Sequence, residues 1–161
     1  MHKTLSHQEY LNQATQLATA NVHNGGGPFG AIIVTADGQV FEGLNRVTAD
    51  NDPTAHAEVT AIRTACTAVG SFSLSGATLY SSCEPCPMCL ASSLWARVDH
   101  VYFGADRHDA ADAGFDDAAF YSYFDTAPEE RSMPVTQLIT AETSHIAPFD
   151  AWRALDTRIE Y

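Results

Sequence analysis

Apolar positions recur with two different periods along this chain, and the changes of period mark the expected helices and strands. In residues 10–23 apolar side chains return every three to four positions, and Ser6-His7-Gln8-Glu9 has the form of a capping box, so a helix is predicted. Residues 29–35 and 39–46 are short strand-like runs joined by Ala36-Asp37-Gly38, which has the composition of a tight turn. The amino-terminal third therefore predicts a helix followed by a β-hairpin.

Helical and strand periods alternate in the middle of the chain. Residues 57–66 carry an apolar stripe of helical period, and residues 77–82 and 98–103 are short apolar runs. A further helix is expected to open near Cys86, because prolines stand on both sides of it and proline is tolerated in a first helical turn. This alternation predicts a mainly parallel α/β sheet that starts with the hairpin.

The last third of the chain has a different character. Residues 106–134 are acidic and dotted with aromatic side chains, and their weak periodicity predicts either a lid or a set of short helices. Residues 135–141 predict another strand, and residues 148–155 a short amphipathic helix. With 161 residues, 45% of them hydrophobic and 17% charged, we expect a single domain over residues 1–161. No apolar run approaches the length of a membrane span.

The charge balance narrows the class of partner. The chain has 8 Lys and Arg against 20 Asp and Glu, a net charge of −12, and Lys3 is its only lysine. Because nucleic-acid affinity rests on Lys and Arg meeting phosphates, a small uncharged substrate is favoured over tRNA or DNA. A purely solvating role for the acidic residues stays open. Four cysteines, three of them in one metal-spaced cluster, and a start unlike a secretory signal predict the cytoplasm.

Two short segments, residues 53–58 and 82–89, contain the residue types of a catalytic metal site. His56, Cys86 and Cys89 supply three ligands that suit a tetrahedral Zn²⁺, and a set of three leaves the fourth position to water. The two cysteines are three residues apart, so they share one helix face near a helix start, which favours thiolates. We therefore expect one zinc ion per subunit.

Glu58 is the candidate general base and poses a geometric problem. Residues two apart on a regular helix point about 200° from each other, so His56 and Glu58 can face one cavity only if the helix begins after His56. A start with Asp52 or Thr54 as the cap and Pro53 just inside provides such an arrangement.

Two other interpretations of the cysteines stay open. The Cys-x-x-Cys pair could be a redox pair, or Cys83 could join His56, Cys86 and Cys89 in a structural zinc site, because it too has ligand spacing. Glu58 favours the catalytic interpretation, since a structural zinc has no use for a neighbouring carboxylate.

With both segments placed, the whole chain resembles the cytidine-deaminase-fold guanine deaminases of bacteria. The His-x-Glu and Pro-Cys-x-x-Cys pattern is typical of zinc nucleobase deaminases in general. Residues 27–31, 51–58 and 82–89 look like segments shared with tRNA adenosine deaminases and yeast-type cytosine deaminases. Ala-Gly-Phe-Asp-Asp at 113–117 and Pro-Phe-Asp-Ala-Trp-Arg at 148–153 are more particular to guanine and guanosine deaminases.

The resemblance implies a cytidine-deaminase-like three-layer α/β/α sandwich, with a five-stranded mixed sheet and an amino-terminal hairpin, assembled as a homodimer. In the bacterial guanine deaminases the carboxyl-terminal segment crosses to cover the partner's active site. Residues 148–161 would then be a lid supplied in trans, with Tyr161 among the substrate-binding residues. Fraying is the usual fate of a chain end, but the apolar Ile159 and the aromatic terminus favour docking.

The reaction that the resemblance implies is the zinc-dependent hydrolysis of guanine to xanthine and ammonia, a step of purine salvage or catabolism. Zinc lowers the pKa of a bound water, and the resulting hydroxide would attack C2 of guanine. Glu58 would take the water proton and deliver it to the ring nitrogen and the leaving amine. The backbone N–H groups of Ala57 and Cys86, both near helix starts, are suited to hold the base and the developing charge.

Further site residues follow from the resemblance alone. Asn45 is expected to donate to the base, and Asp117 to accept from it or to pass protons to the leaving amine. Two neighbouring carboxylates compete for that role: Asp112 and Asp116. Phe29 and Trp95 resemble the aromatic residues that stack on the base, although each could equally pack in the core. An exposed surface position is the alternative for all three carboxylates.

Several competing functions remain. Among enzymes they are guanosine deaminase, cytosine or cytidine deaminase, and tRNA adenosine deaminase. The acidic charge weighs against tRNA, and the Gly-Phe-Asp-Asp stretch with the aromatic tail weighs against cytosine. Guanosine depends on whether the site has room for a ribose. A zinc-stabilised binding module is the alternative outside enzymes, and in such a module Glu58 would have no activity to support.

Overall fold

The computed structural model describes residues 5–161, so the first four residues, including Lys3 and the start that was compared with a secretory signal, lie outside it. The chain forms two compact units, one that ends at Tyr121 and one that runs from Ser122 to Tyr161. The single domain expected over residues 1–161 stays a prediction. The first unit contains the whole sheet, and the second contains only short helical elements.

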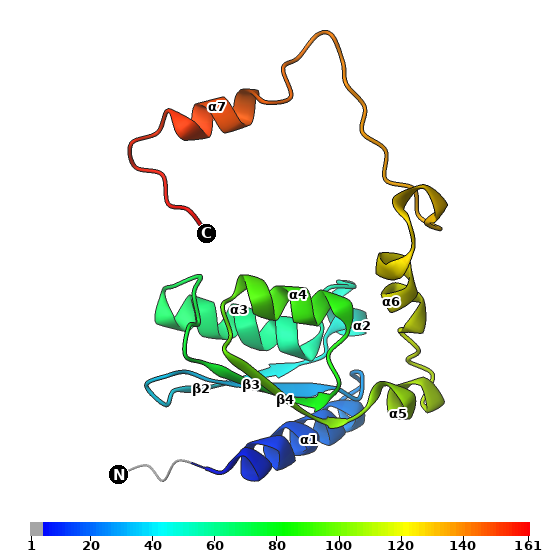
Figure 1. Ribbon diagram of the computed structural model, residues 1–161. Coiled ribbons are helices and arrows are strands. Elements are labelled where there is room, and N and C mark those ends of the chain that lie inside the picture. Colours follow the sequence, from blue (N-terminus) through cyan, green and yellow to red (C-terminus); the bar gives the residue numbers. More distant parts are fainter. Residues whose placement is uncertain (1–4) are drawn as a thin grey trace. The chain divides into compact units, whose positions relative to one another are not determined.

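A four-stranded mixed sheet with the strand order β2-β1-β3-β4 forms the centre of the first unit (Figure 1). Its strands are β1 (Gly30–Val34), β2 (Val40–Leu44), β3 (Thr78–Cys83) and β4 (His100–Ala105). The predicted hairpin is confirmed, since β1 and β2 pair antiparallel from Gly30 opposite Leu44 to Val34 opposite Val40.

The expectation of a mainly parallel sheet was wrong. Strand β1 pairs antiparallel with β3 as well as with β2, and β3 with β4 is the parallel pair. Because β1 lies between β2 and β3, the connection from β2 to β3 passes over it. Strands β2 and β3 therefore run in the same direction, and β1 opposes both of them.

The expectation of a fifth strand was also wrong. Residues 135–141 lie in the second unit, have no regular structure and are exposed. A strand is stable only where its backbone N–H and C=O groups meet those of a partner strand. Residues 135–141 have high strand propensity but no partner strand. The sheet therefore has four strands among the described residues.

Helices cover both faces of the sheet, which confirms the three α/β/α layers (Figure 1). Helix α1 (His7–His23) packs on one face through Tyr10 and Ala14, against Ile32 and Tyr80 of the sheet. Helix α3 (Ala57–Val69) packs on the other face, as the following alanines and strand residues show: Ala57, Ala61, Ala65, Ala31, Ile33 and Leu79. Neighbouring residues of β1 thus point to opposite layers, as the strand period requires.

The remaining elements are short. They are α2 (Val47–Asp50), α4 (Pro87–Trp95), α5 (Arg107–Asp112), α6 (Ala118–Asp125), a 3₁₀ turn (Pro128–Glu130) and α7 (Ala147–Arg153). Of the two possibilities for residues 106–134, the structure has the set of short helices. The capping box before α1 is confirmed: Ser6 Oγ accepts from the N–H of Glu9, and Glu9 Oε2 accepts from the N–H of Ser6 at 2.7 Å. None of the helices in residues 5–161 is long and apolar enough to cross a membrane.

Close packing of α3 on the hairpin depends on Gly43. A Cβ built on Gly43 would overlap the carbonyl oxygen of Ala57 and the backbone nitrogen of Ala61. Both overlapping atoms are backbone, so they cannot move aside as a flexible side chain would. The glycine therefore sets how closely the first turn of α3 approaches the sheet, and that turn carries Glu58.

We expect Gly43→Ala to lower the free energy of unfolding by about 2–3 kcal/mol, because the added methyl group pushes α3 away from β2. Urea unfolding of the zinc-loaded protein measures this. Glu42→Ala, at the exposed neighbouring position of the same strand, is the matched control and should change stability by less than about 0.5 kcal/mol. Equal effects of the two substitutions would contradict the packing argument.

Candidate active site

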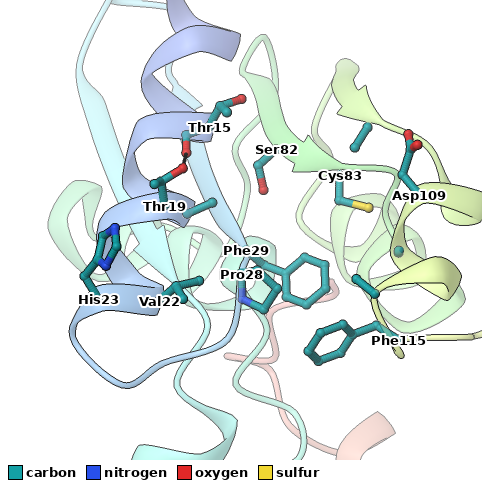
Figure 2. A pocket seen from close by; sticks show the side chains of 14 residues that line it. Thr15, Thr19, Val22, His23, Pro28, Phe29, Ser82, Cys83, Asp109 and Phe115 are labelled. Atoms are coloured by element: carbon teal, nitrogen blue, oxygen red, sulfur yellow. Dashed lines mark hydrogen bonds between the residues drawn. The ribbon is translucent and has the colours of Figure 1, made fainter.

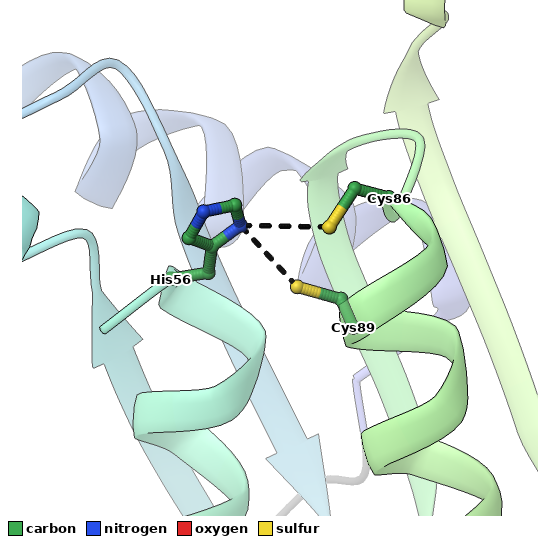
Figure 3. Close-up of side chains that lie close together, drawn as sticks. All are labelled: His56, Cys86 and Cys89. Atoms are coloured by element: carbon green, nitrogen blue, oxygen red, sulfur yellow. Dashed lines mark hydrogen bonds between the residues drawn. The ribbon is translucent and has the colours of Figure 1, made fainter. Parts of the chain in front are cut away.

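Two helix starts carry the predicted metal ligands. His56 is the N-cap of α3, and Cys86 is the N-cap of α4, each with extended backbone (ψ 156° and 168°). Cys89 lies in the first turn of α4. Figure 3 shows the imidazole of His56 facing both sulfurs. Because an N-cap residue is not yet helical, the side chains of His56 and Glu58 can line one cavity, as expected.

The predicted cap of α3 was wrong in detail. Asp52 accepts hydrogen bonds from the backbone N–H and the hydroxyl of Thr54, at 2.8 and 2.7 Å. These contacts close a turn at Asp52–Thr54 rather than the helix, because the backbone there is not helical. The helix begins only at Ala57, with His56 itself as the cap residue.

The three ligand atoms have the spacing of a tetrahedral zinc site. His56 Nδ1 lies 3.7 Å from Cys86 Sγ and 3.5 Å from Cys89 Sγ, and all three atoms lie within 4.8 Å of one another. A nitrogen and a sulfur bound to one tetrahedral Zn²⁺ are about 3.6 Å apart, so the observed distances are those of two edges of the tetrahedron. The residues present therefore fit one zinc ion.

Cys83 does not join this group in the described part of the chain. It is buried, and its Sγ donates a hydrogen bond to the backbone oxygen of Asp106 at 3.6 Å. Burial raises the pKa of the Cys83 thiol to about 11, which is unlike a zinc-ligating thiolate. The structural site with three cysteines is therefore not supported, and no disulfide links any of the four cysteines.

The electrostatics of the ligands favour a bound cation. A hydrogen bond from the Cys89 thiol, with a further one from His56, holds the pKa of Cys86 at about 4. The same hydrogen bond and burial raise the pKa of Cys89, and the contact with Cys86 raises the pKa of His56. One thiol proton is thus shared between two sulfurs, and a divalent ion that binds both would release it.

Glu58 is buried beside the ligands. Its side chain is 6% exposed, and its Oε1 accepts a hydrogen bond from the Ser81 hydroxyl at 3.2 Å. Burial is the main cause of the raised pKa of Glu58. A carboxylate with a raised pKa is a stronger proton acceptor than an ordinary one, which suits a general acid–base residue.

A cavity of about 800 Å³ in the first unit opens onto these residues. Its lining includes most of the predicted site residues: Phe29, Asn45, His56, Glu58, Cys86, Asp116 and Asp117. Small-molecule sites in proteins commonly measure about 300–1,000 Å³, so the cavity has the size of such a site. Burial raises the pKa of Asp117, and the negative charge of Cys86 adds to that effect.

Asn45 is held in place by a network that sequence reasoning missed. Asn21 Nδ2 donates to the backbone oxygens of Asn45 and Gly27, at 2.9 and 2.8 Å. Asn45 Oδ1 accepts from the N–H of Val47 at 3.3 Å, so its amide nitrogen is the part left to donate to a ligand. A Cβ on Gly27 would lie 2.8 Å from Asn45 Oδ1, which is too close. This explains why the loop after α1 has a glycine at position 27.

A second cavity, of about 430 Å³, lies between α1 and α5 (Figure 2). Phe29, Cys83 and Phe115 line both cavities and form the wall between them. The rings of Phe29 and Phe115 meet edge to face at 5.1 Å. Phe29 also packs partly against the core, and its predicted stacking on a base stays a prediction.

The other predicted site residues do not line the larger cavity. Trp95 ends α4, is 63% exposed and does not line the larger cavity. Ala57 is fully buried at the start of α3. Asp112 ends α5 and does not line the cavity, unlike its competitors Asp116 and Asp117. Tyr161 belongs to the second unit and is 75% exposed.

Two charged residues of the cavity were missed as well. Glu84 and Arg107 line it and form an ion pair of 2.6 Å. Glu84 lies inside the cysteine segment, which was interpreted only for its metal ligands. Arg107 lies in the acidic stretch, where no motif surrounds it. Nothing in their local sequence marks them, because 23 residues separate them.

The family is established by comparison with known proteins. Residues 4–105 match the cytidine and deoxycytidylate deaminase zinc-binding region. Guanine deaminase of Bacillus subtilis (strain 168) is 49% identical over 158 residues, 98% of this chain and all of the relative. A tRNA-specific adenosine deaminase of Haemophilus influenzae is 30% identical over 156 residues, 95% of this chain and 88% of the relative.

The fold agrees with this family. The X-ray structure of guanine deaminase from Bacillus subtilis covers 98% of this chain and 99% of its own, with a TM-score of 0.91 at 50% identity. The resemblance expected from the two metal-ligand segments is thereby confirmed. Matched in sequence, fold and ligand set, the chain belongs to the zinc-binding cytidine and deoxycytidylate deaminase family.

Proposed function

We propose that this zinc-dependent aminohydrolase converts guanine to xanthine and ammonia. The observation that carries the proposal is the 49% identity to Bacillus subtilis guanine deaminase over the full length of that relative. The stretch Ala-Gly-Phe-Asp-Asp at 113–117 supports it as well, since its two carboxylates, Asp116 and Asp117, line the cavity.

The residues at the metal site suit hydrolytic deamination. His56, Cys86 and Cys89 would hold a Zn²⁺, which would supply a Lewis acid that lowers the pKa of a bound water. Glu58 accepts a proton from the attacking water, whose oxygen bonds to C2 of the base. Glu58 then delivers this proton to the ring nitrogen N3, and the proton of the new C2 hydroxyl passes to the amine, so that the bond from C2 to the amine breaks, the C2 carbonyl of xanthine forms and ammonia leaves. The burial of Glu58 and its hydrogen bond with Ser81 hold the Glu58 carboxylate in place for both proton transfers.

The cavity supplies partners for a purine. Guanine offers N–H donors at N1 and its amine, and acceptors at O6 and N7, so it needs both acceptors and donors. We assign Asn45 as a donor, Phe29 as an apolar face, and Asp117 as the carboxylate that passes protons to the leaving amine. The backbone N–H groups of Ala57 and Cys86 stand at helix starts, where they lack intrahelical acceptors and favour developing negative charge.

Guanosine is the second candidate substrate. A cavity of about 800 Å³ is larger than a free base requires and would accommodate a ribose. The net charge of −12 argues against tRNA, although tRNA-specific adenosine deaminases are among the relatives.

We further propose a cytoplasmic homodimer in which residues 148–161 of each chain cover the partner's cavity and bring Tyr161 to the base. Many apolar side chains of the second unit are exposed: Leu138, Ile139, Ile146, Phe149, Leu155, Ile159 and Tyr161. Exposed apolar surface of this extent is typical of a segment that docks on another chain. Trp95 and Leu94, both largely exposed on α4, offer apolar surface on the first unit. Four free cysteines suit a reducing compartment.

Side-by-side assays of ammonia release from guanine, guanosine, cytosine, cytidine and adenine test the substrate. We expect guanine to be turned over with a kcat/KM at least about a hundredfold above the others, since loss of matching polar groups in a buried site costs several kcal/mol. Zinc content is measured on the same sample. Turnover of guanosine alone would replace guanine with the second candidate. Zinc without any deamination would favour a binding module.

Glu58→Gln should lower kcat for guanine by about 10³-fold while one zinc per chain is retained, because the amide cannot take a proton. Cys86→Ser is the comparison variant, and it should lose zinc and activity together. Metal analysis and steady-state kinetics on both variants separate the two roles. A Glu58→Gln enzyme within tenfold of wild type would contradict the general-base assignment.

A mixed dimer tests the lid in trans. One chain carries Glu58→Ala with an intact tail, and the other lacks residues 148–161 but keeps Glu58; each alone should be inactive. In the mixed dimer the truncated chain receives its partner's tail, so the mixture should regain about a quarter of wild-type activity. Mixed dimers isolated through two different tags and found inactive would contradict the trans arrangement.

A further inference from the structure

The ion pair between Arg107 and Glu84 joins two neighbouring strand ends. Glu84 directly follows β3 and Arg107 follows β4 after one residue, and the two strands are parallel. The guanidinium of Arg107 bonds Glu84 Oε1 through Nη2 at 2.6 Å and through Nε at 3.1 Å, and its backbone N–H bonds Oε2 at 3.0 Å. Both carboxylate oxygens are engaged, and the side chains are 35% and 20% exposed. Such a multidentate pair holds a defined orientation.

Tyr121 extends this pair into a closed ring of contacts. The guanidinium carbon of Arg107 lies 3.8 Å from the centre of the Tyr121 ring. The Tyr121 hydroxyl donates to the backbone oxygen of Pro85 at 3.0 Å, and Pro85 follows Glu84 in the chain. We call Glu84, Pro85, Arg107 and Tyr121 the arginine clamp. It links the residue before Cys86 to the first turns of α6.

The arginine clamp is linked to Asp117 through the first turn of α6. Asp117 immediately precedes α6, and its backbone oxygen accepts from the N–H of Phe120 at 2.9 Å. The N–H of Ala118 donates to Asp116 Oδ1 at 2.9 Å, which caps the same turn. Tyr121 stands four residues, about one helical turn, after Asp117. Whatever fixes Tyr121 therefore fixes where the Asp117 carboxyl group enters the cavity.

We propose that Arg107 and Tyr121 are positioning residues, which hold the Asp117 carboxyl group against the metal site so that it can pass a proton to the leaving amine. The inference rests on the role proposed above for Asp117. Through the clamp, the metal-ligand segment at Pro85 and the carboxylate-bearing turn before α6 are fixed to one another. Misplacement of such a group by about 1 Å can lower a rate about a hundredfold.

The other ion pairs in the described part of the first unit are more exposed: Arg46 bonds both carboxylate oxygens of Asp50, but the two side chains are 49% and 44% exposed. Arg63 lies 3.4 Å from Asp52, and the two side chains are 59% and 37% exposed. A pair of this kind contributes little to stability. Arg63 does not line the cavity, so Arg63→Met is a matched control for removal of an arginine from an ion pair.

A double-mutant cycle on the full-length, zinc-loaded enzyme tests the proposal. Arg107→Met should lower kcat for guanine by about tenfold to a hundredfold and change KM by less than about threefold, because Asp117, the group that Arg107 positions, acts in a proton transfer. In an Asp117→Asn background the same substitution should change kcat by less than about twofold, since the positioned group is already gone. Arg107→Lys should restore part of the loss, and Arg63→Met should match wild type.

Tyr121→Phe gives a second cycle with a smaller structural change. It removes the hydroxyl bond to Pro85 and keeps the ring under Arg107, so we expect a loss in kcat of about three- to tenfold that again disappears in the Asp117→Asn background. Zinc content and the thermal midpoint, measured on every variant, confirm that each is folded and loaded.

The outcomes separate the inference from the proposed function. If the loss in kcat from Arg107→Met or Tyr121→Phe is as large in the Asp117→Asn background as in the wild type, the effect is a general structural one. That result would overturn the inference. Full activity of Asp117→Asn would overturn it too, while wild-type turnover of guanine would leave the proposed function standing. Failure of the wild type on guanine with turnover of guanosine would correct the substrate, and the same cycles would then be measured on guanosine.

Discussion

The tetrahedral metal site sets the most demanding geometric condition in this protein. One imidazole nitrogen must come within 3.7 Å of two sulfurs that lie 30 and 33 residues further along the chain. The fold meets this condition by bringing the starts of α3 and α4 to the same place on one face of the sheet. His56 and Cys86 are both N-cap residues, so their side chains project from backbone that is not yet helical. Close packing at Gly43 then holds α3 near the sheet.

The site combines buried charge with few compensating cations. Glu58 is almost fully buried, and Cys86 is held as a thiolate at low pKa. Accumulated negative charge of this kind is costly in an apolar interior unless a cation offsets it. A divalent ion at the ligands provides that offset and at the same time activates water. Such an ion would serve both stability and chemistry, as in other sites where metal binding is coupled to folding.

Part of the lining of the larger cavity comes from the chain after β4, and part from the loops after α1 and β2. There the residues that line the cavity belong to loops and short helices, whose positions follow from side-chain contacts rather than from a regular hydrogen-bond ladder. Asn21 fixes Asn45 on one side, and the arginine clamp ties α6 to the metal-ligand segment on the other. Such second-layer contacts decide how accurately polar groups face a substrate.

By itself the sequence determined the local features: the Ser6 capping box, the hairpin, the helix opening at Cys86 and the metal ligands. Each depends on residues a few positions apart or on side-chain chemistry that a motif reveals. Only the tertiary structure decided the direction of β1 relative to β3, the absence of a strand at residues 135–141, and the contacts of Asn21 and Arg107. These depend on partners 20 or more residues away, or on a strand partner whose absence leaves backbone groups unpaired, and local sequence carries no record of either.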